Sequence, residues 1–355
     1  MIDYLHLNTS FSDNLGLING KSASILYFSS LEDPFYAEDI AYSFLEELLG
    51  QVNVASLLDY GNGFAGIGSL INYLHQKELL EESPFELFSE PEDTLIKVLF
   101  GARCHEITLS EGLPGIGMYF LFRLRDSGLP EDSFQAMRYK EAIIATIDQL
   151  NHLLKRMPQE KLAEYDLSIW HGWSGVYLYL LQAKRLGYVK EKIAELTLQV
   201  RKIMVGMLGT AKVSWMHLEA WFTLFQDPDT WQNEVMADRL EQYLQQIKSE
   251  PVDFYNAAFY ALLLRLLGEA TGAASASDQL ENFVRKKLDE IPLSRLFSAD
   301  PRTGAIPMGL DRGLVGTALP LHSLETGNWE WLELLGIGEM QYEKLGKKSV
   351  MKNFE

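Results

Sequence analysis

The residue types that most often bind metals are sparse in this chain. Its one cysteine, Cys104, can form no internal disulfide and no multi-cysteine zinc site. Cys104 stands beside His105, but an adjacent Cys-His pair is more typical of an ordinary buried thiol. His217 and Glu219 are two positions apart, so on a helix they point to different faces and form no metal pair. The residues alone therefore predict no metal site.

A second group of candidates stands beside glycines and mixes aromatic with polar side chains. They are Asn62, Glu111, Trp170, Trp173, Asp311 and Arg312. Aromatic residues with a few polar groups suit a peptide or sugar ligand. Simpler roles are also open, because tryptophans at a helix start commonly serve packing and Asp311 with Arg312 could form a local ion pair.

These glycines belong to an internal repeat. In five segments a glycine is followed by two or three variable residues, a small residue and an apolar run with helical periodicity. The segments start at Gly20, Gly63, Gly112, Gly172 and Gly313, so successive starts are 43, 49, 60 and 141 residues apart. Because the last gap is three times 47, it predicts two degenerate copies, around His217 and Ala257.

Amphipathic segments alternate with the repeat segments, at 37–50, 134–157, 189–209 and 235–250. Their charges indicate one solvated face, whereas the repeat segments are apolar all round and so buried on both sides. Glycine at a helix start allows close approach of a neighbour, or the positive φ of a sharp turn. Strand patterns are weak. We therefore predict an all-α fold, an α/α toroid of seven helical hairpins with 211–225 and 253–267 as the fifth and sixth inner helices.

Residues 1–340 are expected to form one domain. Segments 82–94, 227–230, 268–278 and 299–309 contain Pro, Gly, Ser or Asp clusters and are predicted loops, too short for interdomain linkers. Residues 341–355 are polar and without periodicity, which predicts a flexible tail.

Composition narrows the class of function. The chain has 355 residues and is 47% hydrophobic, so it can bury a large core. Its net charge is −18. The negative charge argues against nucleic acid and against anionic membrane surfaces as partners. The chain lacks a long apolar stretch and a signal-peptide pattern at its start. We therefore expect a cytoplasmic protein without membrane insertion.

The repeat segments resemble those of the lanthionine synthetase C-like family, the cyclases of lantibiotic biosynthesis. The phrases that carry the resemblance are NGKSASILYF, GNGFAGIG, LSEGLPGIGMYFL, HGWSGVYLYL and GLDRGLVGTAL. In that family a zinc ion at one mouth of the toroid is held by two cysteines and a histidine, and it activates a peptide thiol. The resemblance places these ligands at Met216, Tyr255 and Asn256, which are poor zinc ligands. It therefore implies a zinc-less member with no metal cofactor.

The resemblance also implies a role for His171, which matches a histidine proposed as acid or base in cyclisation. A structural histidine that caps a helix is the alternative. The acid that should accompany it is expected before Gly112, where Thr108 stands. The full set expected at the mouth is His171 with Glu111, Trp170, Trp173, Met216, His217, Tyr255, Asn256, Asp311 and Arg312.

Three functions are compatible with these residues. The first is a zinc-less, non-catalytic lanthionine synthetase C-like protein that binds a peptide substrate or a maturation-enzyme partner during peptide modification. The second is a metal-independent cyclase that adds a peptide thiol to a dehydrated Ser or Thr. The third is another α/α-toroid enzyme, such as a glycoside hydrolase or lyase, with Glu111 and Asp311 as the paired carboxylates.

Overall fold

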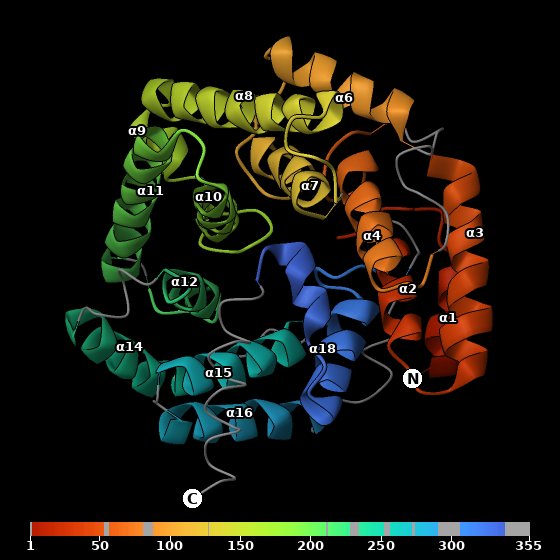
Figure 1. Ribbon diagram of the computed structural model, residues 1–355. Coiled ribbons are helices and arrows are strands. Elements are labelled where there is room, and N and C mark those ends of the chain that lie inside the picture. Colours follow the sequence, from red (N-terminus) through yellow and green to blue (C-terminus); the bar gives the residue numbers. More distant parts are fainter. Residues whose placement is uncertain are drawn as a thin grey trace, which may run out of the picture.

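The computed structural model shows helices arranged in a ring (Figure 1). It describes residues 2–52, 57–80, 88–126, 128–210, 212–227, 234–251, 256–271, 274–289 and 306–337, and within these ranges it contains no strand. In the same ranges no helix combines the length and the apolar composition needed to cross a bilayer. The predicted tail at 341–355 lies outside the described residues.

Seven inner helices surround the centre in the part of the chain that is described. They are α2 (Ser22–Ser29), α4 (Phe64–Gln76), α7 (Leu113–Asp126), α10 (Trp173–Leu186), α12 (Met216–Leu224), α15 (Ala257–Thr271) and α18 (Leu314–Thr326). From α4 to α18 each packs on the next, and α18 packs on α2. A backbone hydrogen bond from Ile18, before α2, to Gly61, before α4, closes the ring. The predicted α/α toroid is confirmed, including the fifth and sixth inner helices, which lack the glycines.

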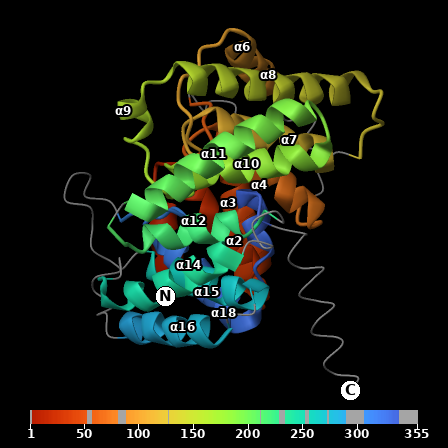
Figure 2. The same cartoon turned by 90° about the vertical axis from the view of Figure 1, so that its left-hand side faces the viewer.

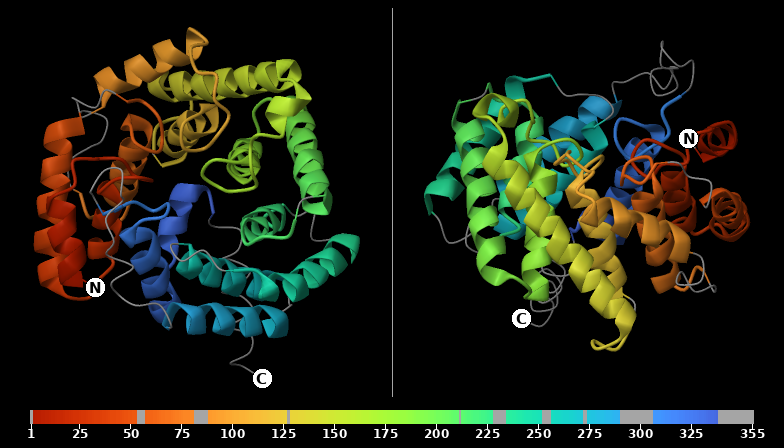
Figure 3. Two further views of the ribbon diagram at one scale, coloured as in Figure 1. Left: turned by 180° about the vertical axis from the view of Figure 1, so that it is seen from behind. Right: turned by 90° about the horizontal axis from the view of Figure 1, so that it is seen from above.

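Outer helices shield the inner ones. Four pack directly on an inner helix: α3 (Ala41–Val52) on α2, α8 (Phe134–Arg156) on α7, α11 (Lys190–Thr210) on α10 and α16 (Ala274–Asp289) on α15. The others are α1 (Ile2–Ser10), α6 (Ser89–Phe100) and α14 (Glu234–Gln246). Short helical turns are η1 (Phe35–Ile40), α9 (Gln159–Leu162), η2 (Ile247–Ser249) and η3 (Glu330–Leu335). Figures 2 and 3 show the outer layer from the side, from behind and from above.

Two predicted loops are partly helical. Residues 89–94 belong to α6, whose first turn holds Pro91, a position where a missing backbone N–H does little harm. At 268–278, α15 runs to Thr271 and α16 begins at Ala274. The small residues of ASASD at the start of α16 are compatible with a helix because alanine is the strongest helix former.

The glycines give the inner helices a repeated entry geometry. A Cβ on the second glycine of the motif would lie 1.9–2.1 Å from the carbonyl oxygen six residues earlier, at Gly66, Gly115, Gly175 and Gly316. The first glycines Gly63, Gly172 and Gly313 have φ of −117°, −131° and −120°. Close approach therefore explains these glycines, and a positive φ does not.

Replacing Gly175 by alanine should lower the free energy of unfolding by about 2–3 kcal/mol, because the added Cβ meets the Ile169 carbonyl oxygen at 2.1 Å. Gly206, in α11, is the matched control, since a Cβ there meets nothing within 4 Å. Gly206→Ala should stabilise the chain by about 0.5–1 kcal/mol through helix propensity. Urea unfolding of both variants measures the difference, and equal effects would contradict the close-approach explanation.

Backbone hydrogen bonds join the loops that lead into these helices. The N–H of Asp311 donates to the carbonyl of Ile18 (3.0 Å), and Ile18 donates to Gly61 (2.9 Å). Gly61 donates to Ser110 (2.7 Å), and Ser110 donates to Trp170 (2.9 Å). All five residues stand two positions before the first glycine of their repeat. We call this chain of hydrogen bonds the entry belt; it fixes the mouth of the ring on the side of the helix N-termini.

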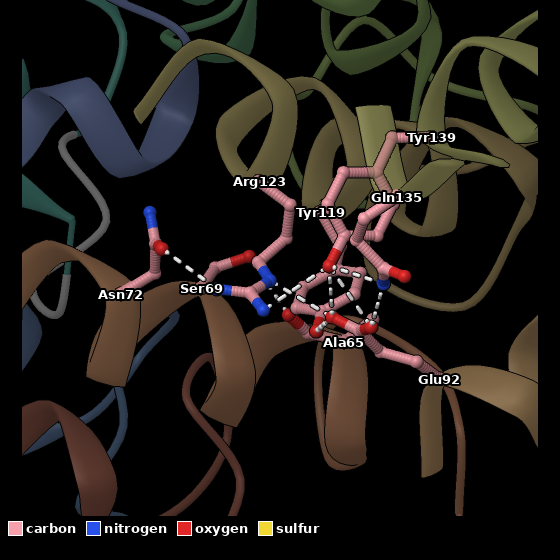
Figure 4. A network of polar contacts seen from close by, with 8 residues as sticks. All are labelled: Ala65, Ser69, Asn72, Glu92, Tyr119, Arg123, Gln135 and Tyr139. Carbon is pink, nitrogen blue, oxygen red and sulfur yellow. Dashed lines mark hydrogen bonds and ion pairs between the residues drawn. The ribbon is translucent and has the colours of Figure 1, made fainter. Parts of the chain in front are cut away.

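A buried polar network ties α4, α6, α7 and α8 together (Figure 4). The guanidinium of Arg123, 1% exposed, donates to Glu92 (Nε to Oε1, 2.8 Å), to Asn72 (3.2 Å) and to Tyr139 (3.1 Å). Tyr119 donates to the same Glu92 oxygen at 2.6 Å. An ion pair so far from water holds only because its remaining polar atoms are also bonded.

Candidate functional site

A pocket of about 220 Å³ opens at the mouth, among the residues that lead into α10, α12, α15 and α18. Its lining is Asp166, Ser168, Trp170, His171, Ser214, Trp215, Met216, Glu219, Glu250, Pro251, Asn256, Tyr260, Asp311 and Arg312. We call it the entry pocket. It lies between Trp170 and Asp311, the two ends of the entry belt, where the repeats without glycines stand.

His171 and Asp311 form an ion pair across this pocket. The Nε2 of His171 lies 3.2 Å from Oδ2 of Asp311, on the seventh repeat. The hydrogen bond that His171 donates to Asp311 raises the pKa of His171 above its usual value; burial opposes this rise, and the negative charges of Asp311, Glu111 and Asp166 add to it. The ion pair therefore stabilises the imidazolium form of His171 relative to the neutral imidazole.

The acid that accompanies His171 is thus Asp311. Thr108, which stands at the position where the resemblance places this acid, has another role. Thr108 Oγ accepts the backbone N–H of Glu111 at 3.2 Å. Asp59 and Ser168 accept the equivalent N–H groups of Asn62 (2.6 Å) and His171 (3.2 Å). These contacts stabilise the entry loops. The sequence pattern within one repeat cannot show a pairing between repeats four and seven.

Glu219 is the second unusual group of the pocket. It is 3% exposed, and its Oε2 accepts the backbone N–H of Ile169 at 2.6 Å. Burial chiefly raises the pKa of Glu219 to about 8, helped by the charges of Asp311 and Asp166 and opposed by the bond from Ile169 and the charge of Arg312. The carboxyl is therefore mostly protonated at pH 7 and can donate a hydrogen bond.

Glu219 was missed as a site residue from the sequence, where it was considered only as a metal partner for His217. A signal did exist: it is the only charged residue of MHLEAWFTL, the otherwise apolar segment that forms α12. A carboxyl on a buried helix is a candidate for a functional role. Asp166, Ser168, Ser214, Trp215, Glu250, Pro251 and Tyr260 were also missed as site residues.

An aromatic wall closes one side of the pocket. The rings of Trp215 and Tyr260 are stacked, with centroids 5.7 Å apart and planes inclined by 22°. The indole N–H of Trp215 donates to the carbonyl of Glu250 at 3.2 Å. The wall is therefore fixed in place and buried, with Trp215 4% and Tyr260 2% exposed.

The residues at the family's zinc position do not fit a zinc ion. Met216 and Asn256 line the same pocket, as the repeat alignment predicts, and Tyr255 lies outside the described residues. A thioether and a neutral amide are weak ligands for zinc. Across the described ranges, no group of three or more His, Cys, Asp or Glu side chains is arranged to hold a metal.

Three predicted mouth residues lie outside the pocket lining. Trp173 is fully buried, where its indole N–H donates to Leu162 (3.3 Å) and its ring meets Tyr165 edge-on. His217 lines a different cavity, on the other face of α12 from Glu219, in agreement with the expected helix geometry. Glu111 is exposed and does not line the pocket, although its charge acts on His171.

No family model and no curated protein matches this sequence. Among solved structures, nisin cyclase matches with a TM-score of 0.66 and 16% sequence identity, over 94% of each chain. At this identity the likeness concerns the fold. The resemblance of the repeats to lantibiotic cyclases is thus matched in three dimensions: this chain has the α/α-toroid fold of nisin cyclase.

Proposed function

We propose that this chain is a zinc-less relative of the lantibiotic cyclases that binds a peptide in the entry pocket, as a component of modified-peptide maturation. The observation that carries the proposal is the place of the pocket. It opens where the entry belt ends, and four repeats contribute its walls. The resemblance to the cyclases supplies the substrate class.

The chemistry of the pocket supports a peptide ligand. Charged groups of both signs, Asp166, Asp311 and Arg312, line the pocket together with the aromatic wall. Pockets for cofactors and drug-sized molecules commonly measure about 300–1,000 Å³. A volume of about 220 Å³ suits a short piece of a longer chain. A maturation enzyme that presents such a peptide segment would be recognised by the same groups.

Asp311→Asn should weaken peptide binding roughly tenfold, because hydrogen bonds to charged groups contribute about 1.5–3 kcal/mol and the variant removes the charge that pairs with His171. Peptides selected from a random display library on the purified chain serve as ligands, titrated by calorimetry with chelator present. Asp93→Asn, an exposed acid of α6 paired with Arg138, is the matched control and should bind like the parent. Equal affinity of both variants and the parent would place binding outside the pocket.

A metal-independent cyclase is the second candidate, favoured by His171, Asp311 and the protonated Glu219 in one pocket. In such a reaction His171 takes the thiol proton, the sulfur bonds to Cβ of the dehydrated residue, and Glu219 returns a proton to Cα. A peptide with one cysteine and one dehydroalanine tests it: loss of free thiol with chelator present, abolished in His171→Asn, supports catalysis. Thiol loss at the uncatalysed rate argues against it.

A further inference from the structure

The entry belt has a direction and two unfilled ends. In each of its four hydrogen bonds the N–H of one repeat donates to the carbonyl of the next, from Asp311 through Ile18, Gly61 and Ser110 to Trp170. The donor left over is the N–H of Trp170, and the acceptor left over is the carbonyl of Asp311. Within the described ranges neither group has a hydrogen-bond partner. Both residues line the entry pocket.

Burial makes the unfilled donor end informative, whereas Asp311 at the acceptor end is half-buried. Trp170 is 4% exposed. Buried backbone N–H and carbonyl groups in proteins nearly always have a partner, from the protein, from water or from a ligand. The backbone N–H of the neighbouring Ile169 does have a hydrogen-bond partner, because it donates to the side chain of Glu219.

The fifth repeat does not extend the belt. Its entry loop is folded on itself: the N–H of Ser214 donates to Nδ1 of His217 (3.0 Å), and the carbonyl of Ser214 accepts the hydroxyl of Tyr243 (3.2 Å). Residues 252–255 of the sixth repeat lie outside the described residues. Between the two belt ends the described structure holds the entry pocket.

We propose that the backbone of an extended peptide completes the belt, with a peptide carbonyl accepting from the N–H of Trp170 and a peptide N–H donating to the carbonyl of Asp311. This inference rests on the proposed peptide-binding function and deepens it. The mode is that of strand addition, in which main-chain hydrogen bonds hold an extended segment and pockets read its side chains. The polarity of the belt allows one direction of the peptide.

Side-chain recognition follows from this placement. Successive side chains of an extended peptide point to opposite faces. One face meets the wall of Trp215 and Tyr260, and the other meets the charged groups Asp166 and Arg312. The ligand class is therefore a secondary-amide backbone, with an apolar residue next to a polar one.

The test uses the blocked tripeptides acetyl-Ala-Xaa-Ala-methylamide, with Xaa as Ala, Phe, Lys or Glu. Each is titrated against protein carrying ¹⁵N in the tryptophan amides and ¹³C in the isoleucine carbonyls. Trp170 follows Ile169, and this is the only Ile-Trp pair in the chain, so its amide signal is identified without mutation. We expect the Trp170 amide signal to shift downfield on binding.

Ester analogues then test the other half of the hydrogen-bond pair. Replacing the central peptide N–H by oxygen should weaken the best tripeptide roughly 3- to 10-fold, while an ester at the acetyl end should bind like the amide. Equal affinity of both esters, or binding without movement of the Trp170 signal, overturns strand addition and leaves peptide binding in place. Failure of every tripeptide to bind overturns the proposed function and the inference with it.

Discussion

Arg123→Met should lower the free energy of unfolding by about 3–5 kcal/mol, the largest loss that we expect from a single substitution in this chain. The reason is that the buried carboxylate of Glu92 loses the positive charge that pairs with it. Glu92 is 2% exposed, and Arg123 is the cation that pairs with it, at 2.8 Å. Hydroxyls from Tyr119 and Tyr139 remain, but they cannot neutralise a buried charge. Urea unfolding measures the loss.

Arg138→Met is the matched control, since Arg138 of α8 forms an exposed ion pair with Asp93, the neighbour of Glu92 in α6. Its effect should stay within about 1 kcal/mol. The double variant Glu92→Leu with Arg123→Met should recover most of the stability lost, because no charge then stays buried. A single Arg123 variant as stable as the control would show that the network does not hold α6 to α7.

Glu219→Gln should stabilise the chain by about 3 kcal/mol at pH 7 and by almost nothing at pH 4. In the unfolded chain this carboxyl ionises near its usual pKa of 4.5, whereas in the folded chain it keeps its proton up to about pH 8. The folded parent therefore loses about 1.4 kcal/mol of stability for each pH unit between these values. Glutamine does not ionise, and its oxygen can still accept the N–H of Ile169.

Unfolding curves at pH 4, 6 and 8 measure this difference. Glu164→Gln, an exposed position, is the control and should follow the parent at every pH. A constant offset between the Glu219 variant and the parent would mean that this carboxyl ionises normally. Groups that reduce stability at the working pH are commonly kept for function, which favours a role of Glu219 in ligand recognition.

The architecture could be predicted because it depends on periodic patterns. The apolar runs of α12 and α15 survive without glycine, and the 141-residue spacing indicates how many repeats lie between Gly172 and Gly313. Helical periodicity and spacing are local properties that a sequence displays directly. The bounds at 268–278 were misjudged because small polar residues are compatible with both loops and helix starts.

The site could be predicted only in part. Six of the expected residues line the entry pocket, because the motif register places them there: Trp170, His171, Met216, Asn256, Asp311 and Arg312. The pairing of His171 with Asp311 joins residues 140 positions apart, and no pattern within a repeat encodes it. The burial of Glu219 depends likewise on how four repeats meet.

The ring is fastened where its last repeat meets its first. At this join, unlike the others, no intervening hairpin links the neighbours, so α18 must find α2 across almost the whole chain. Asp311 contributes to both features. Its backbone N–H donates to Ile18 where the last repeat meets the first, and its carboxylate pairs with His171 in the pocket. A nascent chain that ends before residue 311 therefore lacks the part of the entry pocket that Asp311 and Arg312 form. The lining of the entry pocket is therefore complete only when the seventh repeat has been added to the growing chain.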